Sequence, residues 1–233
     1  MIAGIFHAGS GIGNQLFRFV GTRILANNRF EEHGMVAPEL FKGTSFMKLP
    51  LTDAGLEYKI QEQTGKVIIE DLKGVVVVDA EFQSELDFIQ DIDEVREWLK
   101  VEPMELPDNL CVISHRGGEY TMFPDLYLTN EYWDKAIEMM RDINPNMKFE
   151  VQTDDVASAQ IQFPDFPIIH DVAHNWRSIR FAKYLIVGNS SFSILPSLVN
   201  EDVKKIIAPK FHAGHNKGYW QEPQNCYGTY SYI

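Results

Sequence analysis

The sequence predicts an α/β fold made of two Rossmann-like halves that face each other across a cleft. Short apolar runs alternate along the chain with stretches of helical periodicity, which favours largely parallel strands covered by helices. Residues 101–108 (Val-Glu-Pro-Met-Glu-Leu-Pro-Asp) combine prolines with little periodicity, so they indicate a linker. We therefore expect an N-terminal half over residues 1–104 and a C-terminal half over residues 105–233.

The expected elements follow from these periodicities. Apolar runs predict strands at 2–6, 34–37, 67–69, 75–79, 110–114, 148–152, 168–170, 184–187 and 204–208. Helical periodicity predicts helices at 14–27, 84–100, 130–142, 156–160, 176–182 and 192–200. Ser84 and Asn130 precede periodic runs with acids in the first turn, so we expect each to cap its helix. Residues 41–66 are expected to be irregular, and no element is assigned to residues 211–233.

Composition restricts the function classes. The formal net charge of −12 repels a phosphate backbone at long range, so we expect no nucleic-acid partner. We expect neither a transmembrane segment nor a signal peptide. The two cysteines, Cys111 and Cys226, form no disulfide framework, which favours a reducing cytoplasm. His212 and His215 have a metal-like spacing without an obvious third ligand, so we expect no metal site.

A glycine-rich segment follows the first apolar run. Residues 9–18 read Gly-Ser-Gly-Ile-Gly-Asn-Gln-Leu-Phe-Arg and lead into a helix-like stretch. Glycines at positive φ and unpaired N–H groups at a helix start let a backbone approach phosphate closely. The segment is not a P-loop, because no Gly-Lys-Ser/Thr follows. A tight turn that packs a helix on a strand is the alternative interpretation.

Polar residues follow three of the predicted C-terminal strands. Arg116 stands at a strand end before two glycines, where a guanidinium suits an anionic ligand in an inter-domain crevice. Asp154 and Asp155 end another strand and could accept hydrogen bonds from ribose hydroxyls or a base edge. Residues 189–193 (Asn-Ser-Ser-Phe-Ser) end a strand and open a helix, which gives a third terminus suited to an anion.

These motifs, in this order, resemble those of the α-1,2-fucosyltransferases of glycosyltransferase family 11. The family's Gly-Gly-Leu-Gly-Asn-Gln-Leu-Phe is matched by residues 10–17, and its Tyr-Phe-Gln-Ser by residues 81–84. Its His-x-Arg-Arg-Gly-Asp-Tyr is approximated by residues 114–120, and its Ser-Asp-Asp corresponds to 153–155. Its Asn-Ser-Ser-Phe-Ser is intact at 189–193. The resemblance implies a GT-B-type fold and transfer of L-fucose from GDP-fucose to a glycan hydroxyl with inversion. It also implies that no metal or other cofactor is needed.

The chain departs from the family pattern at several positions. Ser114 occupies the histidine position, with His115 one residue along and therefore on the opposite face of the strand. Gly117 replaces the second arginine and Glu119 replaces the aspartate. Lys183 or Arg180 is a candidate substitute for the missing arginine. The family's Trp-Trp after the serine motif is Ile-Leu here.

The candidate site residues form two groups. The candidate catalytic residues are Arg116, Asn14 and Glu119. The candidate donor-binding residues are Gly11, Gly13, Gln15, Ser114, His115, Asp154, Asp155, Asn189, Ser190 and Ser191. No general base is identified, and Glu119, His7 and His115 are the open candidates.

Structural roles and other functions remain as alternatives. Arg116 could form a surface ion pair, Asn14 could cap its helix, and one of the two aspartates could start the following helix. For Ser190 and Ser191, helix capping and phosphate binding are both open. Gln83 and Ser84 are expected to form a turn and a helix cap that also line the cleft. The alternative functions are a transferase using another nucleotide sugar and a non-catalytic module that binds a glycan or nucleotide.

Overall fold

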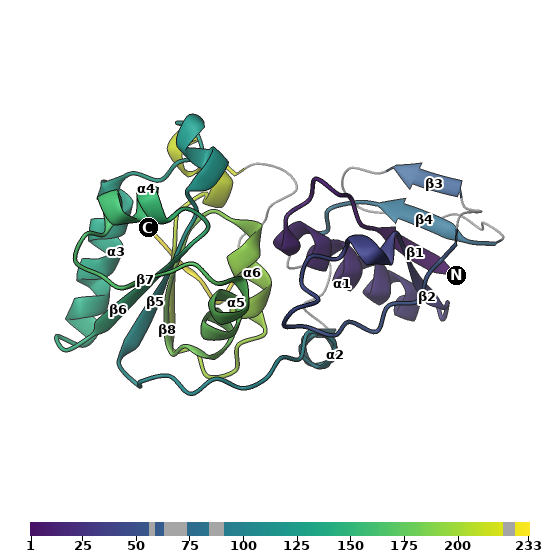
Figure 1. Ribbon diagram of the computed structural model, residues 1–233, viewed down its shortest axis with the longest axis horizontal. Coiled ribbons are helices and arrows are strands. Elements are labelled where there is room, and N and C mark those ends of the chain that lie inside the picture. The colour runs from purple at the N-terminus through teal and green to yellow at the C-terminus, as the bar shows by residue number, and fades with distance from the viewer. Residues whose placement is uncertain (56–58, 63–73, 84–90, 221–226) are drawn as a thin grey trace. The chain divides into compact units, whose positions relative to one another are not determined.

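The computed structural model describes residues 1–55, 59–62, 74–83, 91–220 and 227–233. The chain divides into two compact units, Met1–Val101 and Glu102–Ile233 (Figure 1), with the boundary at the start of the proline-containing segment. Each unit contains a parallel sheet with helices packed against it. The predicted α/β fold class is confirmed, and each unit is described by itself below.

The N-terminal unit has a parallel sheet of strand order β2-β1-β4-β3. Its elements are β1 (Ile2–Ile5), α1 (Ile12–Asn28), β2 (His33–Val36), the 3-10 helix η1 (Pro38–Leu40), β3 (Lys59–Glu62), β4 (Val76–Asp79) and α2 (Ile92–Trp98). The chain passes from β1 through α1 to β2 on one side, and β4 pairs with the other side of β1. The carboxyl ends of β1 and β4 therefore flank a topological switch point, where open α/β sheets commonly bind ligands.

Small residues let α1 pack closely against its surroundings. A side chain at Gly4 in β1 would place Cβ 2.7 Å from the Thr22 hydroxyl oxygen on α1. A Cβ at Gly21 would lie 2.1 Å from the Phe82 ring, so Phe82 of the predicted 81–84 motif packs directly on the helix. These contacts hold the second half of the helix close to β1 and to Phe82.

The C-terminal unit has a parallel sheet of strand order β10-β9-β8-β5-β6-β7. Its strands are β5 (Leu110–His115), β6 (Lys148–Thr153), β7 (Ile168–Ile169), β8 (Tyr184–Val187), β9 (Lys205–Ala208) and β10 (Ser231–Tyr232). Its helices are η4 (Gly118–Met122), α3 (Asn130–Ile143), α4 (Val156–Gln162), α5 (Val172–Phe181), α6 (Ser191–Leu198) and η5 (His212–Lys217). From β5 the chain winds outward to β6 and β7, then returns to add β8 on the opposite side, so β5 and β8 flank a second switch point.

Helices cover both faces of this sheet. Figure 1 shows α3 and α4 on one side of the strands and α5 and α6 on the other. Cys111 and Ile113 of β5 belong to the buried cluster that includes Trp133 of α3 and Phe163 beside α4. Because side chains alternate along a strand, His115 shares that face. The alternation therefore directs the His115 side chain into the core.

Several sequence expectations differ from the structure. The segment expected to be irregular contains β3, and the unassigned tail contains η5 and β10. Asn130 does not cap α3, because Thr129 occupies the N-cap position and its side chain makes no capping hydrogen bond. Helix α5 begins at Val172, before the predicted start, because Asp171 Oδ1 accepts a hydrogen bond from the His174 N–H at 2.7 Å. The predicted strand at 67–69 and the predicted cap Ser84 lie outside the described residues.

Candidate functional site

The candidate site of the C-terminal unit lies at the switch point between β5 and β8. Arg116 directly follows β5, and residues 188–190 directly follow β8. The two strand ends are joined by a hydrogen bond of 2.9 Å from the Gly188 N–H to the Ser114 carbonyl oxygen. A Cβ at Gly188 would lie 3.0 Å from that oxygen, so the close approach favours glycine. The fold thus brings two of the predicted motifs to one sheet edge.

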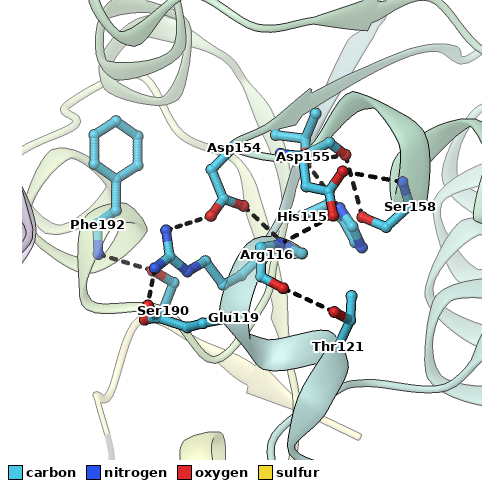
Figure 2. Close-up of polar contacts among 12 residues, drawn as sticks. His115, Arg116, Glu119, Thr121, Asp154, Asp155, Ser158, Ser190 and Phe192 are labelled. Carbon is cyan, nitrogen blue, oxygen red and sulfur yellow. Dashed lines mark hydrogen bonds and ion pairs between the residues drawn. The ribbon is translucent and has the colours of Figure 1, made fainter.

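Arg116 is held between two carboxylates. Its Nη1 lies 2.5 Å from Asp154 Oδ2, and its Nη2 donates a 2.9 Å hydrogen bond to Glu119 Oε1 (Figure 2). Its guanidinium carbon lies 5.3 Å from the centre of the Tyr120 ring, within range of a cation–π contact. The Arg116 side chain is 31% exposed and that of Glu119 is 61% exposed. The arginine is therefore partly open to solvent, and the carboxylate on its Nη2 is the more exposed of its two partners.

The two glycines after Arg116 allow a close contact with the end of β6. The Gly117 N–H donates to Asp154 Oδ1 at 2.9 Å, and the Gly118 N–H donates to Asp155 Oδ2 at 3.2 Å. A Cβ at Gly117 would lie 2.2 Å from the Ser158 hydroxyl oxygen, and Gly118 has φ of +45°. An arginine at position 117, as in the family motif, would collide with this corner. The turn as it packs here therefore leaves no room for a second arginine at this position.

Asp154 and Asp155 have different roles. Asp155 caps α4 by accepting hydrogen bonds from the Ala157 and Ser158 N–H groups at 3.1 and 3.2 Å. The hydrogen bond from the Ser158 backbone, with smaller contributions from Gly118 and Ala157, lowers the pKa of Asp155. Asp155 is thus the aspartate that starts the helix. Asp154 instead binds the Arg116 guanidinium and the Gly117 N–H.

His115 lies in the core of the C-terminal unit. Its ring packs against Tyr127, Trp133 and Phe163, with centroid separations of 6.0, 5.8 and 5.6 Å. Its Nδ1 lies 3.0 Å from the Thr153 hydroxyl oxygen. Burial lowers the pKa of His115 to about 4, although Asp154 and a hydrogen bond with Gln162 oppose the shift. The imidazole is therefore neutral at pH 7 and only 4% exposed, so the structure removes it from the candidate bases.

Two residues of the serine motif after β8, Asn189 and Ser190, make hydrogen bonds within the unit. Ser190 Oγ accepts a 3.3 Å hydrogen bond from the Phe192 N–H and so caps α6, in which Ser191 is the first residue. The Asn189 side chain donates a 2.6 Å hydrogen bond to the Leu126 carbonyl oxygen. Asn189 and Ser114 are buried. The start of α6 lies at the same sheet edge as Arg116, because it follows β8, the neighbour of β5.

The glycine segment of the N-terminal unit has a different geometry from the one expected. Gly11 is the N-cap of α1 at φ −70°, and neither Gly9, Gly11 nor Gly13 has positive φ. A Cβ on Gly9 or Gly11 would meet nothing within 4 Å, whereas Gly13 is buried inside the helix. The expectation of positive φ in this segment was wrong. What the segment provides is open space beside the helix start.

Asn14 and Gln15 connect this helix to neighbouring loops. Asn14 does not cap α1, and its Oδ1 accepts a 3.2 Å hydrogen bond from Gln83 Nε2. Gln15 is fully buried: its Nε2 donates to the Leu40 carbonyl oxygen at 2.8 Å, and its Oε1 accepts from the Lys42 N–H at 3.0 Å. Gln83 is buried as well, so its side chain connects the segment after β4 to α1.

Two candidate substitutes for the missing arginine lie elsewhere. Lys183 directly precedes the amino end of β8, opposite the edge that carries Arg116, and its Nζ pairs with Asp108 at 2.5 Å. Arg180 is in the last turn of α5 and pairs with Glu201 at 3.3 Å. The suggestion that either residue replaces the second arginine was wrong.

Sequence reasoning missed two charged residues in the N-terminal unit. These residues are Asp79, which ends β4, and Arg18 of α1. Asp79 contacts both Arg18 and His7 at the carboxyl edge of the sheet. The available signals were an aspartate closing a predicted strand and an arginine closing the glycine segment. Neither signal showed that Asp79 contacts His7, because the two residues are 72 positions apart in the sequence.

Comparison with known proteins shows the fold. No protein-family model matches the sequence, and no curated protein matches it significantly. Within the described residues, no helix is both long and apolar enough to cross a membrane. The structure is similar to the crystal structure of NodZ α-1,6-fucosyltransferase soaked with GDP-fucose, with a TM-score of 0.59 and 10% sequence identity over 91% of this chain and 96% of that one. This chain therefore has a fucosyltransferase-like α/β fold built on parallel sheets.

Proposed function

We propose that the protein is a glycosyltransferase that moves L-fucose from GDP-fucose to a glycan hydroxyl with inversion and without a metal. The single observation that carries the proposal is Arg116 at the β5/β8 switch point, partly exposed and held at one nitrogen by Asp154. The fold of a fucosyltransferase solved with GDP-fucose supports this choice of donor. The order of the motifs, similar to that of family 11, supports an α-1,2 linkage.

The chemical requirement is to stabilise charge on the leaving diphosphate. The acceptor oxygen forms a bond to the anomeric carbon while the bond from that carbon to the β-phosphate oxygen breaks, and the electron pair leaves with GDP. A fixed guanidinium can donate a charge-assisted hydrogen bond to a phosphate oxygen as this charge develops. In our proposal Asp154 keeps Nη1 oriented, and the exposed Glu119 releases Nη2 to the β-phosphate.

In this proposal the two units bind different substrates. The C-terminal unit, which carries Arg116, holds the nucleotide sugar, with the capped start of α6 directed to the same edge. The N-terminal unit holds the acceptor beside the open glycine segment, where Gly9 and Gly11 leave room for a ligand. This assignment rests on the switch points of the two sheets, where ligands of α/β proteins bind.

A binding module without catalysis is the second candidate. Two observations favour it: Arg116 already has two carboxylate partners, and the packing of Gly117 leaves no room for a second arginine. A site of this kind could bind a nucleotide or glycan and lack the charge needed to drive the departure of GDP. Turnover separates the two candidates.

The test begins with ligand stabilisation. GDP should raise the melting temperature more than UDP, ADP or CMP, with and without EDTA, since a ligand at ~100 times its Kd adds about 2.7 kcal/mol. GDP release from GDP-fucose is then measured with galactose-terminated acceptors. A larger shift with UDP would redirect the donor assignment to another nucleotide sugar. GDP binding without any turnover would identify the binding module.

A further inference from the structure

A histidine–aspartate pair lies at the switch point of the N-terminal sheet. His7 follows β1 and Asp79 closes β4, and these two strands are adjacent and parallel. His7 Nε2 lies 3.0 Å from Asp79 Oδ1 and 3.1 Å from Oδ2. An ionised carboxylate can only accept, so Nε2 carries the proton and Nδ1 is left with the lone pair.

Arg18 fixes the carboxylate of this pair. Its Nη1 on α1 forms an ion pair with Asp79 Oδ1, and the Arg18 side chain is only 9% exposed. Burial alone would raise the pKa of Asp79, but the hydrogen bonds and charges of His7 and Arg18 outweigh it and lower the pKa. Asp79 therefore stays ionised and oriented, which holds the imidazole in one tautomer.

The imidazole is partly open to solvent. The His7 side chain is 41% exposed, against 21% for Asp79. The segment that follows His7 contains Gly9 and Gly11, where even a Cβ would meet no atom within 4 Å. His7 is therefore a partly exposed histidine at the carboxyl edge of the sheet, followed by a segment without bulky side chains at Gly9 and Gly11.

We propose that His7 is the general base that deprotonates the acceptor hydroxyl, with Asp79 and Arg18 as positioning residues. The inference rests on the proposed glycosyl transfer. The acceptor O–H gives its proton to His7 Nδ1 as its oxygen bonds to the anomeric carbon, and the carbon–oxygen bond to the β-phosphate breaks. GDP leaves with that electron pair, and the imidazolium that forms is stabilised by Asp79.

The test compares two histidine–carboxylate pairs. His7→Gln removes the base at a partly exposed position. His174→Gln is the matched control, because His174 Nε2 also contacts a carboxylate, Glu150 Oε1, at 2.9 Å in the C-terminal unit. We expect His7→Gln to lower transfer by about 100-fold or more, in the range of general-base catalysis, with GDP affinity unchanged within about twofold. His174→Gln should retain transfer.

Chemical rescue tests the role of the imidazole itself. Added imidazole should restore part of the transfer to His7→Ala and leave the wild type unaffected. Asp79→Asn should lower transfer while GDP affinity is kept, since the imidazole loses the partner that sets its tautomer. Melting curves identify any variant that fails to fold.

The outcomes separate this inference from the proposed function. A wild-type protein that transfers fucose together with a His7→Gln variant that transfers equally well would overturn the base and leave the function intact. So would a loss in His7→Ala that imidazole does not restore at all. A wild-type protein that binds GDP without transferring to any acceptor would instead overturn the proposed function.

Discussion

Arg116 Nη1 lies 2.5 Å from Asp154 Oδ2, and this contact joins the ends of two neighbouring strands, β5 and β6. The same carboxylate accepts the Gly117 N–H at 2.9 Å, so one aspartate orients both the guanidinium and the turn that follows it. Glu119 completes the arrangement from within the turn. Variants of Arg116 and Glu119 test whether this group binds phosphate or only stabilises the fold.

Arg116 should matter more for turnover than for stability. Arg116→Lys keeps the charge and loses the planar fork, so we expect turnover to fall by about 100-fold, as when one preorganised donor to a developing oxyanion is removed. The unfolding free energy should change by no more than about 1 kcal/mol, because the ion pairs are partly exposed. GDP release assays and thermal melts measure the two effects. Unchanged turnover in Arg116→Ala would remove the residue from the donor site.

Glu119 should compete with the phosphate for Arg116. Glu119→Gln removes the negative charge from Nη2, and we expect GDP to bind up to about fivefold more tightly, which corresponds to an exposed ion pair of up to 1 kcal/mol. Calorimetric titration with GDP measures this affinity. A large loss of turnover with unchanged GDP affinity would instead assign Glu119 as the base.

Replacement by alanine should destabilise the protein at Gly117 and have little effect at Gly11. Gly117→Ala places Cβ 2.2 Å from the Ser158 oxygen and 2.7 Å from Asp155 Cβ, so overpacking should lower the unfolding free energy by about 1–3 kcal/mol. Gly11→Ala adds a methyl group in open space at an unstrained φ of −70°, so stability should hardly change. Urea unfolding of both variants provides the comparison. Any loss of acceptor or GDP affinity in Gly11→Ala would then report on a ligand and not on the fold.

His115 should make the protein sensitive to acid. Its pKa is about 4 in the folded protein and about 6.5 when unfolded, so between these values the unfolded chain binds more protons. The unfolding free energy therefore falls as pH drops from 6.5 towards 4, by roughly 3 kcal/mol at most, and levels off below. His115→Asn should weaken this dependence of the unfolding free energy on pH. Burial also lowers the pKa of His33 to about 4, so His33 should still contribute a pH dependence in that variant. Urea unfolding at about pH 7 and about pH 5 measures the difference, and an unchanged slope would contradict the assignment.

Local sequence signals predicted most elements of the sheets because apolar runs and helix periods depend on neighbouring residues. Strand β3 was missed because its four residues, Lys59–Glu62, are largely polar and gain their order by pairing with β4. The start of α5 was misplaced because Asp171 extends the helix through a capping hydrogen bond that the apolar pattern does not contain. The predicted importance of Arg116 stays a prediction, whereas the core position of His115 corrects its place in the site.

By itself, the sequence determined the alternation of strands and helices and therefore which residues end parallel strands, since these features depend on the local order of side chains. It could not determine which strand ends become neighbours, because strand order is decided by packing between distant segments. The tertiary structure alone placed Asp154 on Arg116, across 38 residues, and Asp79 on His7, across 72. It also decided that Gly117 must remain a glycine, because Ser158 and Asp155 occupy the space that a larger side chain would need.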